Sequence, residues 1–591
     1  IYPLAPLQEG ILFHHLLEPE GDTYLLRQSL FFDERAQLDA FLVALQAVID
    51  RHDILRTGIH WHGLSQPVQL VQRQAPLPIH TITLDAEGDA IEQLHARTDP
   101  RHVRLDLQRA PLLSAYIAPD PHSAQWMMVL LSHHMVSDHV TVELIVAEIQ
   151  AILQGRDADL PPPLPYRNFI SQARAISVLE HETYFRHQLG DIDEPTAPFG
   201  VIDLLGTTSD VAEAHLMLTD DLAQRIRDTA RGLGVTAAVL FHAAWALVLN
   251  KCTGHDSVVF GTVLSGRMQG TSGADRVLGM FINTLPVRIS LAERSVHQVV
   301  LDTYQRLSEL FVHEQASLAL AQRCSGVSAP MPLFTTLLNY RHSKVSSAPT
   351  DDPASDDAWG GMRLMSSEER TNYPMTLAVD DYGIGFGLTA LCRPGIDPAR
   401  VSCYFNSAME GLVDALTAGP GRLIKTLAIL PESERQQLLV GFNDTAAPYP
   451  HDQLIHQLFE AQAAIQPDAI ALVYAGQQLT YDQLNRRANQ LAHHLLALGV
   501  QPDDRVAICA ERSLDMIVGL IGILKAGAAY VPLDPSYPSD RLAYMLGDSA
   551  PVALLTQAAL VAGLPALTPP VILLDADGAA IGQQADSNPD P

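Results

Sequence analysis

Apolar and polar positions alternate along the chain with two different spacings. One helix face is marked by six apolar residues at helical spacing: Leu38, Phe41, Leu42, Leu45, Val48 and Ile49. By contrast, residues 126–131 (WMMVLL) form a continuous apolar run, which is typical of a strand buried on both faces. Residues 141–153 return to helical spacing directly afterwards. This mixture of elements predicts an α/β fold.

Three stretches interrupt the pattern. Residues 190–198 (GDIDEPTAP) are acidic and contain proline, so they are expected to join two lobes. Residues 344–361 are rich in Ser, Pro and Asp and predict a surface loop. Residues 442–450 (FNDTAAPYP) follow a polar helix at 431–440 and predict an interdomain linker.

Composition narrows the classes of function. With 38 Lys and Arg against 67 Asp and Glu, the net charge of −29 argues against a nucleic-acid partner and against docking on anionic lipid. The five cysteines contain no CxxC spacing, so we expect reduced thiols and a cytoplasmic location. The longest apolar run, 516–524, is far shorter than the ~20 residues that span a bilayer. Without an initiator Met or a signal peptide, the chain is expected to be a piece of a longer one.

The sequence LSHHMVSDH at 131–139 carries the first candidate chemistry. It joins the buried strand to the following helix, and such a loop projects side chains from a rigid edge. A histidine there can take and return a proton near neutral pH. Alternatively, two adjacent histidines on a loop can simply pack against the protein and form a hydrogen bond, without a catalytic role. A metal site is not expected, because His133, His134 and Asp138 lack a suitably spaced third ligand.

The segment from His133 to Asp138 resembles the HHxxxDG signature of condensation domains of nonribosomal peptide synthetases, in all but the last position. Four other segments resemble motifs of that family in the same order: 2–10, 51–57, 165–169 and 279–288. The resemblance implies two chloramphenicol-acetyltransferase-like lobes set in a V, with a tunnel that meets at the histidine loop. The lobes would be residues 1–190 and 191–430, followed by a linker at 431–450.

The same resemblance suggests roles for the loop residues. His134 would act on the attacking amine, either as a base or by holding the amine in position. His133 is also a candidate catalytic residue, with a role expected to be mainly structural. Asp138 would pair with Arg267 and shape the loop. His139 stands where the family has Gly, so it is either a tunnel residue or filler.

A second histidine pair lies at 14–22 (HHLLEPEGD). The spacing of Leu7, Ile11 and His14 places His14 on the apolar face of a helix that starts near Pro6. Histidines at a helix end also interact well with the helix dipole, which is the simpler explanation. However, the segment resembles the lengthened first motif of dual epimerization/condensation domains. That resemblance makes His14 and His15 candidate catalytic residues, and Gly21 and Asp22 candidate tunnel residues.

Residues 451–591 resemble the start of an amino-acid adenylation domain, most specifically at 479–484 and 524–534. The loop that would hold ATP phosphates does not follow, so we expect no adenylation activity and no cofactor or metal bound by the chain. The expected partners are upstream and downstream carrier proteins with 4'-phosphopantetheine arms, and the rest of a synthetase. The leading hypothesis is epimerization of an L donor followed by condensation with an L acceptor. An ordinary condensation domain for a D or fatty-acyl donor, and a non-catalytic docking module, are the alternatives.

Overall fold

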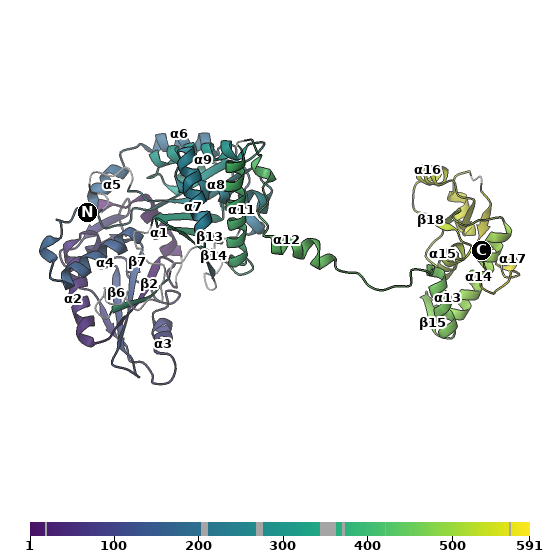
Figure 1. Ribbon diagram of the computed structural model, residues 1–591, viewed down its shortest axis with the longest axis horizontal. Coiled ribbons are helices and arrows are strands. Elements are labelled where there is room, and N and C mark those ends of the chain that lie inside the picture. Colours follow the sequence, from purple (N-terminus) through teal and green to yellow (C-terminus); the bar gives the residue numbers. More distant parts are fainter. Residues whose placement is uncertain are drawn as a thin grey trace. The chain divides into compact units, whose positions relative to one another are not determined.

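A computed structural model describes residues 1–17, 20–202, 211–267, 273, 276–342, 362–368, 373–419, 421–566 and 569–590. The surface loop predicted at 344–361 lies outside the described residues. The chain divides into two compact units, Ile1–Asn443 and Asp444–Pro591 (Figure 1). Each unit has its own sheets and hydrophobic clusters.

The first lobe of unit 1 is built on a five-stranded sheet in the order β12-β2-β7-β6-β5. All neighbours are antiparallel except β5 and β6. The strand predicted from the apolar run is the central one, and it is buried along almost all of its length. The bounds are β2 (Leu25–Phe32), β5 (Ile79–Thr81), β6 (Leu113–Pro119), β7 (Trp126–His133) and β12 (Met362–Glu368).

Helices and a small sheet complete this lobe. The six apolar residues predicted to form one helix face are all buried in α2. The helix predicted after the buried strand is also present, as α4, and it packs against α2. The bounds are α1 (Pro6–Leu17), α2 (Arg35–Arg51), α3 (Ala90–Arg97), α4 (His139–Leu153) and α5 (Arg167–Ala173), with the sheet of β1 (Tyr2–Pro3), β4 (Val68–Val71) and β3 (Thr57–His60). The next helix, α6 (Val178–Leu189), packs with the second lobe, because its Phe185 and Leu189 lie in the hydrophobic cluster of that lobe.

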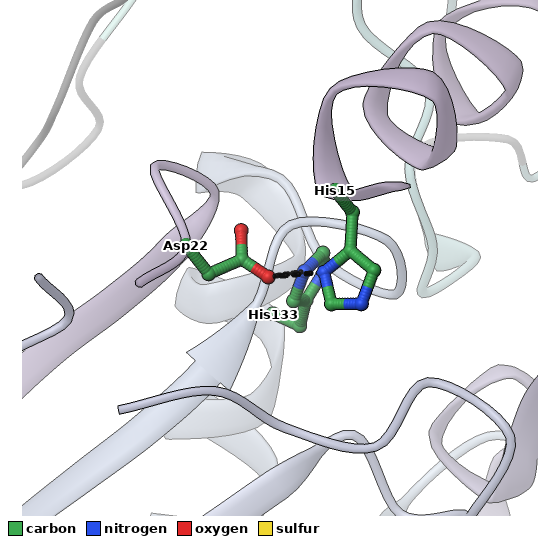
Figure 2. Close-up of side chains that lie close together, drawn as sticks. All are labelled: His15, Asp22 and His133. Carbon is green, nitrogen blue, oxygen red and sulfur yellow. Dashed lines mark hydrogen bonds and ion pairs between the residues drawn. The ribbon is translucent and has the colours of Figure 1, made fainter. Parts of the chain in front are cut away.

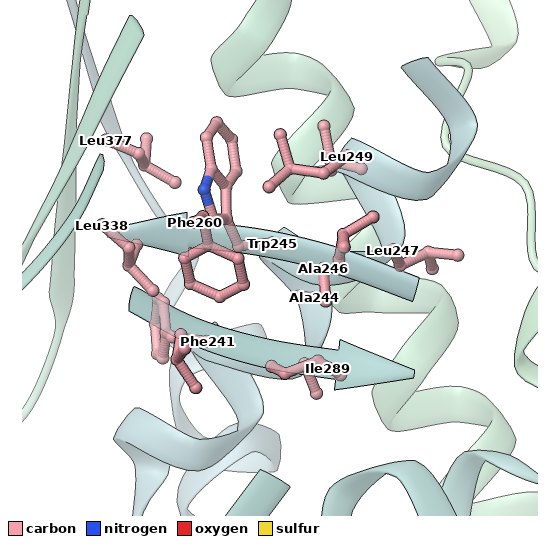
Figure 3. Packing of buried hydrophobic residues seen from close by; sticks show 14 of the residues in the cluster. Phe241, Ala244, Trp245, Ala246, Leu247, Leu249, Phe260, Ile289, Leu338 and Leu377 are labelled. Carbon is pink, nitrogen blue, oxygen red and sulfur yellow. The ribbon is translucent and has the colours of Figure 1, made fainter. Parts of the chain in front are cut away.

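The second lobe contains a six-stranded mixed sheet in the order β10-β9-β11-β13-β14-β8. Its core helix, α8, is buried on almost every side, and Figure 3 shows Trp245 and Phe241 of this helix packed among strand residues such as Phe260. The strands are β8 (Ala212–Met217), β9 (Ser257–Leu264), β10 (Asn283–Ser290), β11 (Thr336–His342), β13 (Met375–Asp381) and β14 (Phe386–Cys392). The helices are α7 (Asp220–Leu233), α8 (Ala237–Thr253), α9 (Val296–Val312), α10 (Leu318–Arg323), α11 (Pro398–Ala418) and α12 (Glu432–Leu439).

Two segments tie the lobes together beyond the chain connection between α5 and α6. Strand β12 lies in sequence between β11 and β13 of the six-stranded sheet, yet it pairs with β2 of the other sheet. Residues 277–281, which precede β10, contribute Leu278, Met280 and Phe281 to the hydrophobic cluster of the first lobe. The second lobe therefore supplies part of the support for the first.

Unit 2 contains a parallel four-stranded sheet, β18-β17-β19-β20, and a two-stranded sheet, β15-β16. Helices α14 and α15 pack on each other beside the parallel sheet. The bounds are α13 (Ile455–Ile465), β15 (Ile470–Tyr474), β16 (Gln477–Thr480), α14 (Tyr481–Ala497), β17 (Arg505–Cys509), α15 (Leu514–Lys525), β18 (Ala529–Leu533), α16 (Ser539–Ser549), β19 (Ala553–Thr556), β20 (Val571–Leu573) and α17 (Gly578–Ile581).

Among the described residues, no single helix combines the length and apolar character needed to cross a membrane. Helices α7 and α8 reach that length and apolar character only when the two are taken together, and they are bent by 107° relative to each other.

Candidate active site

The histidine loop connects the end of β7 at His133 to the start of α4 at His139. Asp138 is the N-cap of α4, and its carboxylate accepts the backbone N–H of Thr141 at 2.8 Å. An aspartate at this position satisfies one of the backbone donors that a helix leaves unpaired at its first turn. The loop is thereby fixed at both ends by regular structure.

Asp138 also forms a buried ion pair with Arg267, whose Nη2 lies 3.1 Å and 3.2 Å from the two carboxylate oxygens. The exposed fractions of these side chains are 1% and 10%. Arg267 donates a second hydrogen bond to Val277 O at 2.8 Å and stacks over the ring of Phe281 at 3.8 Å. The pair therefore fastens the histidine loop to the segment that enters the first lobe from the second.

His134 is half-buried, and its hydrogen bonds define its tautomer. The backbone N–H donates to Tyr24 O at 2.9 Å. Nδ1 lies 3.0 Å from Ser137 O, and because a carbonyl only accepts, Nδ1 carries the proton. In the neutral ring the lone pair then lies on Nε2. This is the atom that can accept a proton from a substrate.

His133 is fully buried, and both of its ring nitrogens have partners. Nδ1 accepts the backbone N–H of Met135 at 3.0 Å, so the proton of the neutral ring lies on Nε2. Nε2 donates to Asp22 Oδ2 at 3.0 Å. His15 Nδ1 donates to the same oxygen at 2.6 Å, and Figure 2 shows the two rings on one carboxylate. The two histidine motifs, more than a hundred residues apart, therefore meet at Asp22.

Asp22, His15 and His133 form one hydrogen-bonded cluster, in which Asp22 is ionised. Burial alone raises the pKa of the Asp22 carboxyl, but the hydrogen bonds from His133 and His15 outweigh burial and hold the pKa well below its usual range. The other oxygen, Oδ1, accepts the backbone N–H of Tyr24 at 3.0 Å. The cluster thus holds one negative charge between two imidazole rings.

His15, Asp22 and His133 are close enough together to be considered as ligands of a metal ion. A divalent ion on His133 would need the lone pair of Nε2, while Nδ1 already accepts a backbone N–H. The ring would then have to lose both of its protons. Neutral imidazole is the usual ligand form, so the cluster is better suited to hydrogen bonding than to metal binding.

The prediction that His14 lies on the apolar face of the first helix is wrong. The buried residues of α1 are Gln8, Ile11, Leu12 and His15, whereas His14 is half-buried and its ring lies against those of Phe13 and Tyr24. The buried face of α1 is rotated by one residue from the predicted face, because the side chain of Gln8 points inward. Its amide donates to Met135 O at 2.7 Å, in the histidine loop.

Gly21 sits in a turn that only glycine fits. Its φ is +72°, and a Cβ there would lie 2.5 Å from Arg101 O. The next N–H, of Asp22, donates to Pro100 O at 2.8 Å, and Arg104 donates to His15 O at 2.5 Å. The turn at 99–104 therefore supports both His15 and Asp22.

Neither Gln8 nor the turn at 99–104 was expected from the sequence. The signals available were a polar residue three positions before Ile11 on a buried helix face, and a basic stretch in an acidic chain. His139 was expected either in the tunnel or as filler, and its side chain is 43% exposed and pairs with Glu143 at 3.2 Å, one turn along α4. Its place in a tunnel stays a prediction.

Comparison with protein families matches residues 1–439 to the condensation domain and residues 459–591 to the AMP-binding enzyme family. The chain is 47% identical over 561 residues to malpinin synthetase of Mortierella alpina, covering 95% of this chain and 7% of that protein. It is 34% identical over 620 residues to a linear gramicidin synthase protein of Brevibacillus parabrevis, covering 98% of this chain and 8% of that protein. The chain thus spans less than a tenth of either relative.

Solved structures agree on the fold. A four-domain nonribosomal peptide synthetase bound to AMP and glycine covers 97% of this chain with a TM-score of 0.79 at 18% identity, and the chain covers 44% of that structure. The first condensation domain of the calcium-dependent antibiotic synthetase covers 72% of this chain with a TM-score of 0.55 at 18% identity, and the chain covers 99% of it. These matches confirm the predicted mixed α/β class. The chain belongs to the condensation domain family of nonribosomal peptide synthetases and continues into the start of an AMP-binding domain.

Proposed function

We propose that this chain inverts a carrier-bound L donor to the D form and then joins it to a carrier-bound L acceptor by a peptide bond. The substrates are aminoacyl or peptidyl thioesters on the 4'-phosphopantetheine arms of an upstream and a downstream carrier protein. Both carriers belong to the synthetase of which this chain is a part. One observation carries the proposal: Asp22 of the 14–22 motif is hydrogen-bonded both to His15 of the same motif and to His133 of the histidine loop.

The condensation step draws on His134. The acceptor amine attacks the donor thioester carbonyl, so a C–N bond forms and the C–S bond breaks. The attacking amine loses a proton, and the departing thiolate takes one up. His134 Nε2 carries the lone pair of the ring, which suits it to accept the amine proton or to hold the amine in place.

The inversion step requires removal of the donor α-proton and its return on the opposite face. Such chemistry requires acid and base groups around the donor Cα in addition to the one that handles the acceptor amine. The cluster of Asp22, His15 and His133 supplies buried proton-carrying groups that are hydrogen-bonded to the histidine loop. This supports the dual activity over ordinary condensation, and the presence of His134 argues against a module that only docks carriers.

The test supplies L-donor and D-donor carriers separately, with an L acceptor, and analyses the released dipeptide by chiral chromatography and mass spectrometry. We expect a D-L dipeptide from both donors. His134→Ala should lower both reactions by ~10²–10⁴-fold. The double replacement of His14 and His15 by Ala should stop product from the L donor and leave product from the D donor.

Each alternative has its own signature in the same assay. An ordinary condensation domain would use the D donor and leave the L donor unchanged. A docking module would give no dipeptide from either donor, although both carriers would bind. A condensation domain for a fatty-acyl donor would give no dipeptide either, but it would acylate the acceptor when a fatty-acyl carrier is supplied. Equal loss of both reactions in the double variant would mean that the first histidine pair supports the fold and not the inversion.

A further inference from the structure

We infer that His15 is the second proton carrier of the inversion and acts on the face of the donor Cα opposite to His134. This inference rests on the proposed function and adds a mechanism with two bases. In this mechanism Asp22 holds the His15 ring in place, and His15 carries the proton that is returned to the donor Cα.

Of the three side chains in the cluster, His15 is the one with a ring nitrogen left for substrate. His133 uses Nδ1 to accept a backbone N–H and Nε2 to donate to Asp22, and its side chain is fully buried. His15 uses Nδ1 for Asp22, and among the described residues no hydrogen-bond partner of its Nε2 is found. Figure 2 shows that second nitrogen on the side of the ring away from the carboxylate.

The carboxylate gives His15 a property that His134 lacks. A carboxylate that accepts the Nδ1 proton fixes the tautomer of an imidazole and stabilises the imidazolium when the ring takes a second proton. His134 donates its Nδ1 proton to a neutral carbonyl, Ser137 O. The carboxylate therefore holds the His15 ring with Nε2 turned away from Asp22, whereas a backbone carbonyl orients the ring of His134.

His15 also lies against the loop that carries His134. The ring of His15 is 5.9 Å from the ring of His133, and His134 is the next residue along the loop. The ring of His14, in contrast, lies against those of Phe13 and Tyr24. The adjacent histidine on α1 is therefore a natural control.

The step balances without any further reactant. Nε2 of His134 takes the α-proton of the L donor, and the C–H electron pair moves onto the thioester carbonyl as an enolate. Nε2 of the His15 imidazolium then gives its proton to the opposite face, and the electron pair returns to Cα. The step leaves His15 neutral and His134 cationic, and proton exchange with water restores the starting forms.

The test uses His15→Asn in the full chain. An Asn amide N–H can replace the Nδ1 donor to Asp22, while the second ring nitrogen is lost. Wild type and variant receive the L-donor carrier in deuterated water, and the released aminoacyl group is analysed for configuration and for α-deuterium. Wild type should give D product carrying deuterium. His15→Asn should lower inversion by ~10²–10⁴-fold while the L donor still gains deuterium through His134.

Two further measurements separate this chemical role from a structural one. His15→Asn should condense a presupplied D donor at the wild-type rate and unfold at the wild-type temperature. In His14→Asn, the matched comparison on the same helix, inversion of the L donor should fall far less than in His15→Asn. If the L donor gains α-deuterium but is not inverted in His15→Asn, the site is still folded, because an unfolded site would catalyse neither reaction.

The inference is overturned if His15→Asn inverts the L donor at the wild-type rate, or if it loses condensation of the D donor equally. Failure of the proposed function looks different. In that case wild type itself shows neither inversion nor α-deuterium with the L donor.

Discussion

At the residue scale, Asp138 has two structural tasks, since it caps α4 and neutralises Arg267. Removing one partner of a buried ion pair strands the other charge. We expect Asp138→Ala to destabilise unit 1 by about 3–5 kcal/mol. All four tryptophans of the chain lie in residues 1–443, so urea unfolding followed by tryptophan fluorescence measures this unit.

Glu143→Ala is the matched control for Asp138, because Glu143 forms the more exposed pair with His139 on the same helix. We expect a loss below about 1 kcal/mol there. Equal unfolding midpoints for Asp138→Ala and wild type would show that the carboxylate contributes nothing to stability.

Gly21 and Gly63 allow backbone strain to be separated from crowding. Their φ values are +72° and +71°, but a Cβ at Gly63 meets nothing within 4 Å, whereas at Gly21 it meets Arg101 O. Gly63→Ala should cost about 1 kcal/mol for the left-handed backbone alone. Gly21→Ala should cost about 2–4 kcal/mol, because overpacking is added, and it should reduce inversion of the L donor by displacing Asp22. Similar unfolding free energies for the two variants would contradict this.

Part of the site at this scale was accessible from the sequence, because the histidine loop is a local motif. The pair of Asp138 with Arg267, 129 residues apart, was implied only by the resemblance to the condensation domain family. The assembly around Asp22 was not accessible, since it depends on how α1 is rotated. That rotation is set by Gln8, whose amide reaches a backbone carbonyl 127 residues away. Apolar spacing alone favours Leu7 as the inward residue, and thus the wrong histidine.

At the element scale, α8 contains a histidine that links stability to pH. His242 is buried, donates from Nδ1 to Ala238 O at 2.7 Å and accepts at Nε2 from Thr262 Oγ1 at 2.8 Å. Burial lowers the pKa of His242 to about 4, against ~6.5 in an unfolded chain. The stability contribution of the neutral ring is therefore complete above pH ~6.5 and is lost as the pH falls toward 4.

Between pH 7 and pH 5, titration of His242 should remove about 2 kcal/mol of unfolding free energy from unit 1. His242→Gln does not titrate in this range, so its loss over the same interval should be smaller by that amount. Urea unfolding at the two pH values measures the difference. Identical losses in wild type and variant would mean that another group accounts for the pH dependence.

Elements differ in how well the sequence predicts them. Strand β7 and helix α2 were predicted because their burial is recorded in a local apolar pattern. Strand β12 was not, because its partner β2 lies more than 300 residues earlier in the chain. A pairing of this kind depends on the tertiary structure and leaves no local periodicity.

At the scale of the whole molecule, the two units have separate hydrophobic cores. The clusters of unit 2 use buried residues between Leu484 and Leu574, and those of unit 1 end at Ile429. Residues 444–450 are exposed throughout. Separate cores predict separate unfolding transitions, because cooperativity requires shared packing.

We therefore expect residues 1–443, expressed alone, to unfold in urea at the same midpoint as unit 1 in the full chain, by tryptophan fluorescence. Far-UV circular dichroism of the full chain should show a further transition from unit 2. Brief chymotrypsin treatment should cut first near Tyr449, which is 65% exposed, and release two stable fragments. The fragment 1–443 should keep the dipeptide-forming activity, because His15, Asp22, His134 and Arg267 all lie within it. Coincident fluorescence and dichroism transitions, or a lower midpoint for the isolated fragment, would show that the two units stabilise each other.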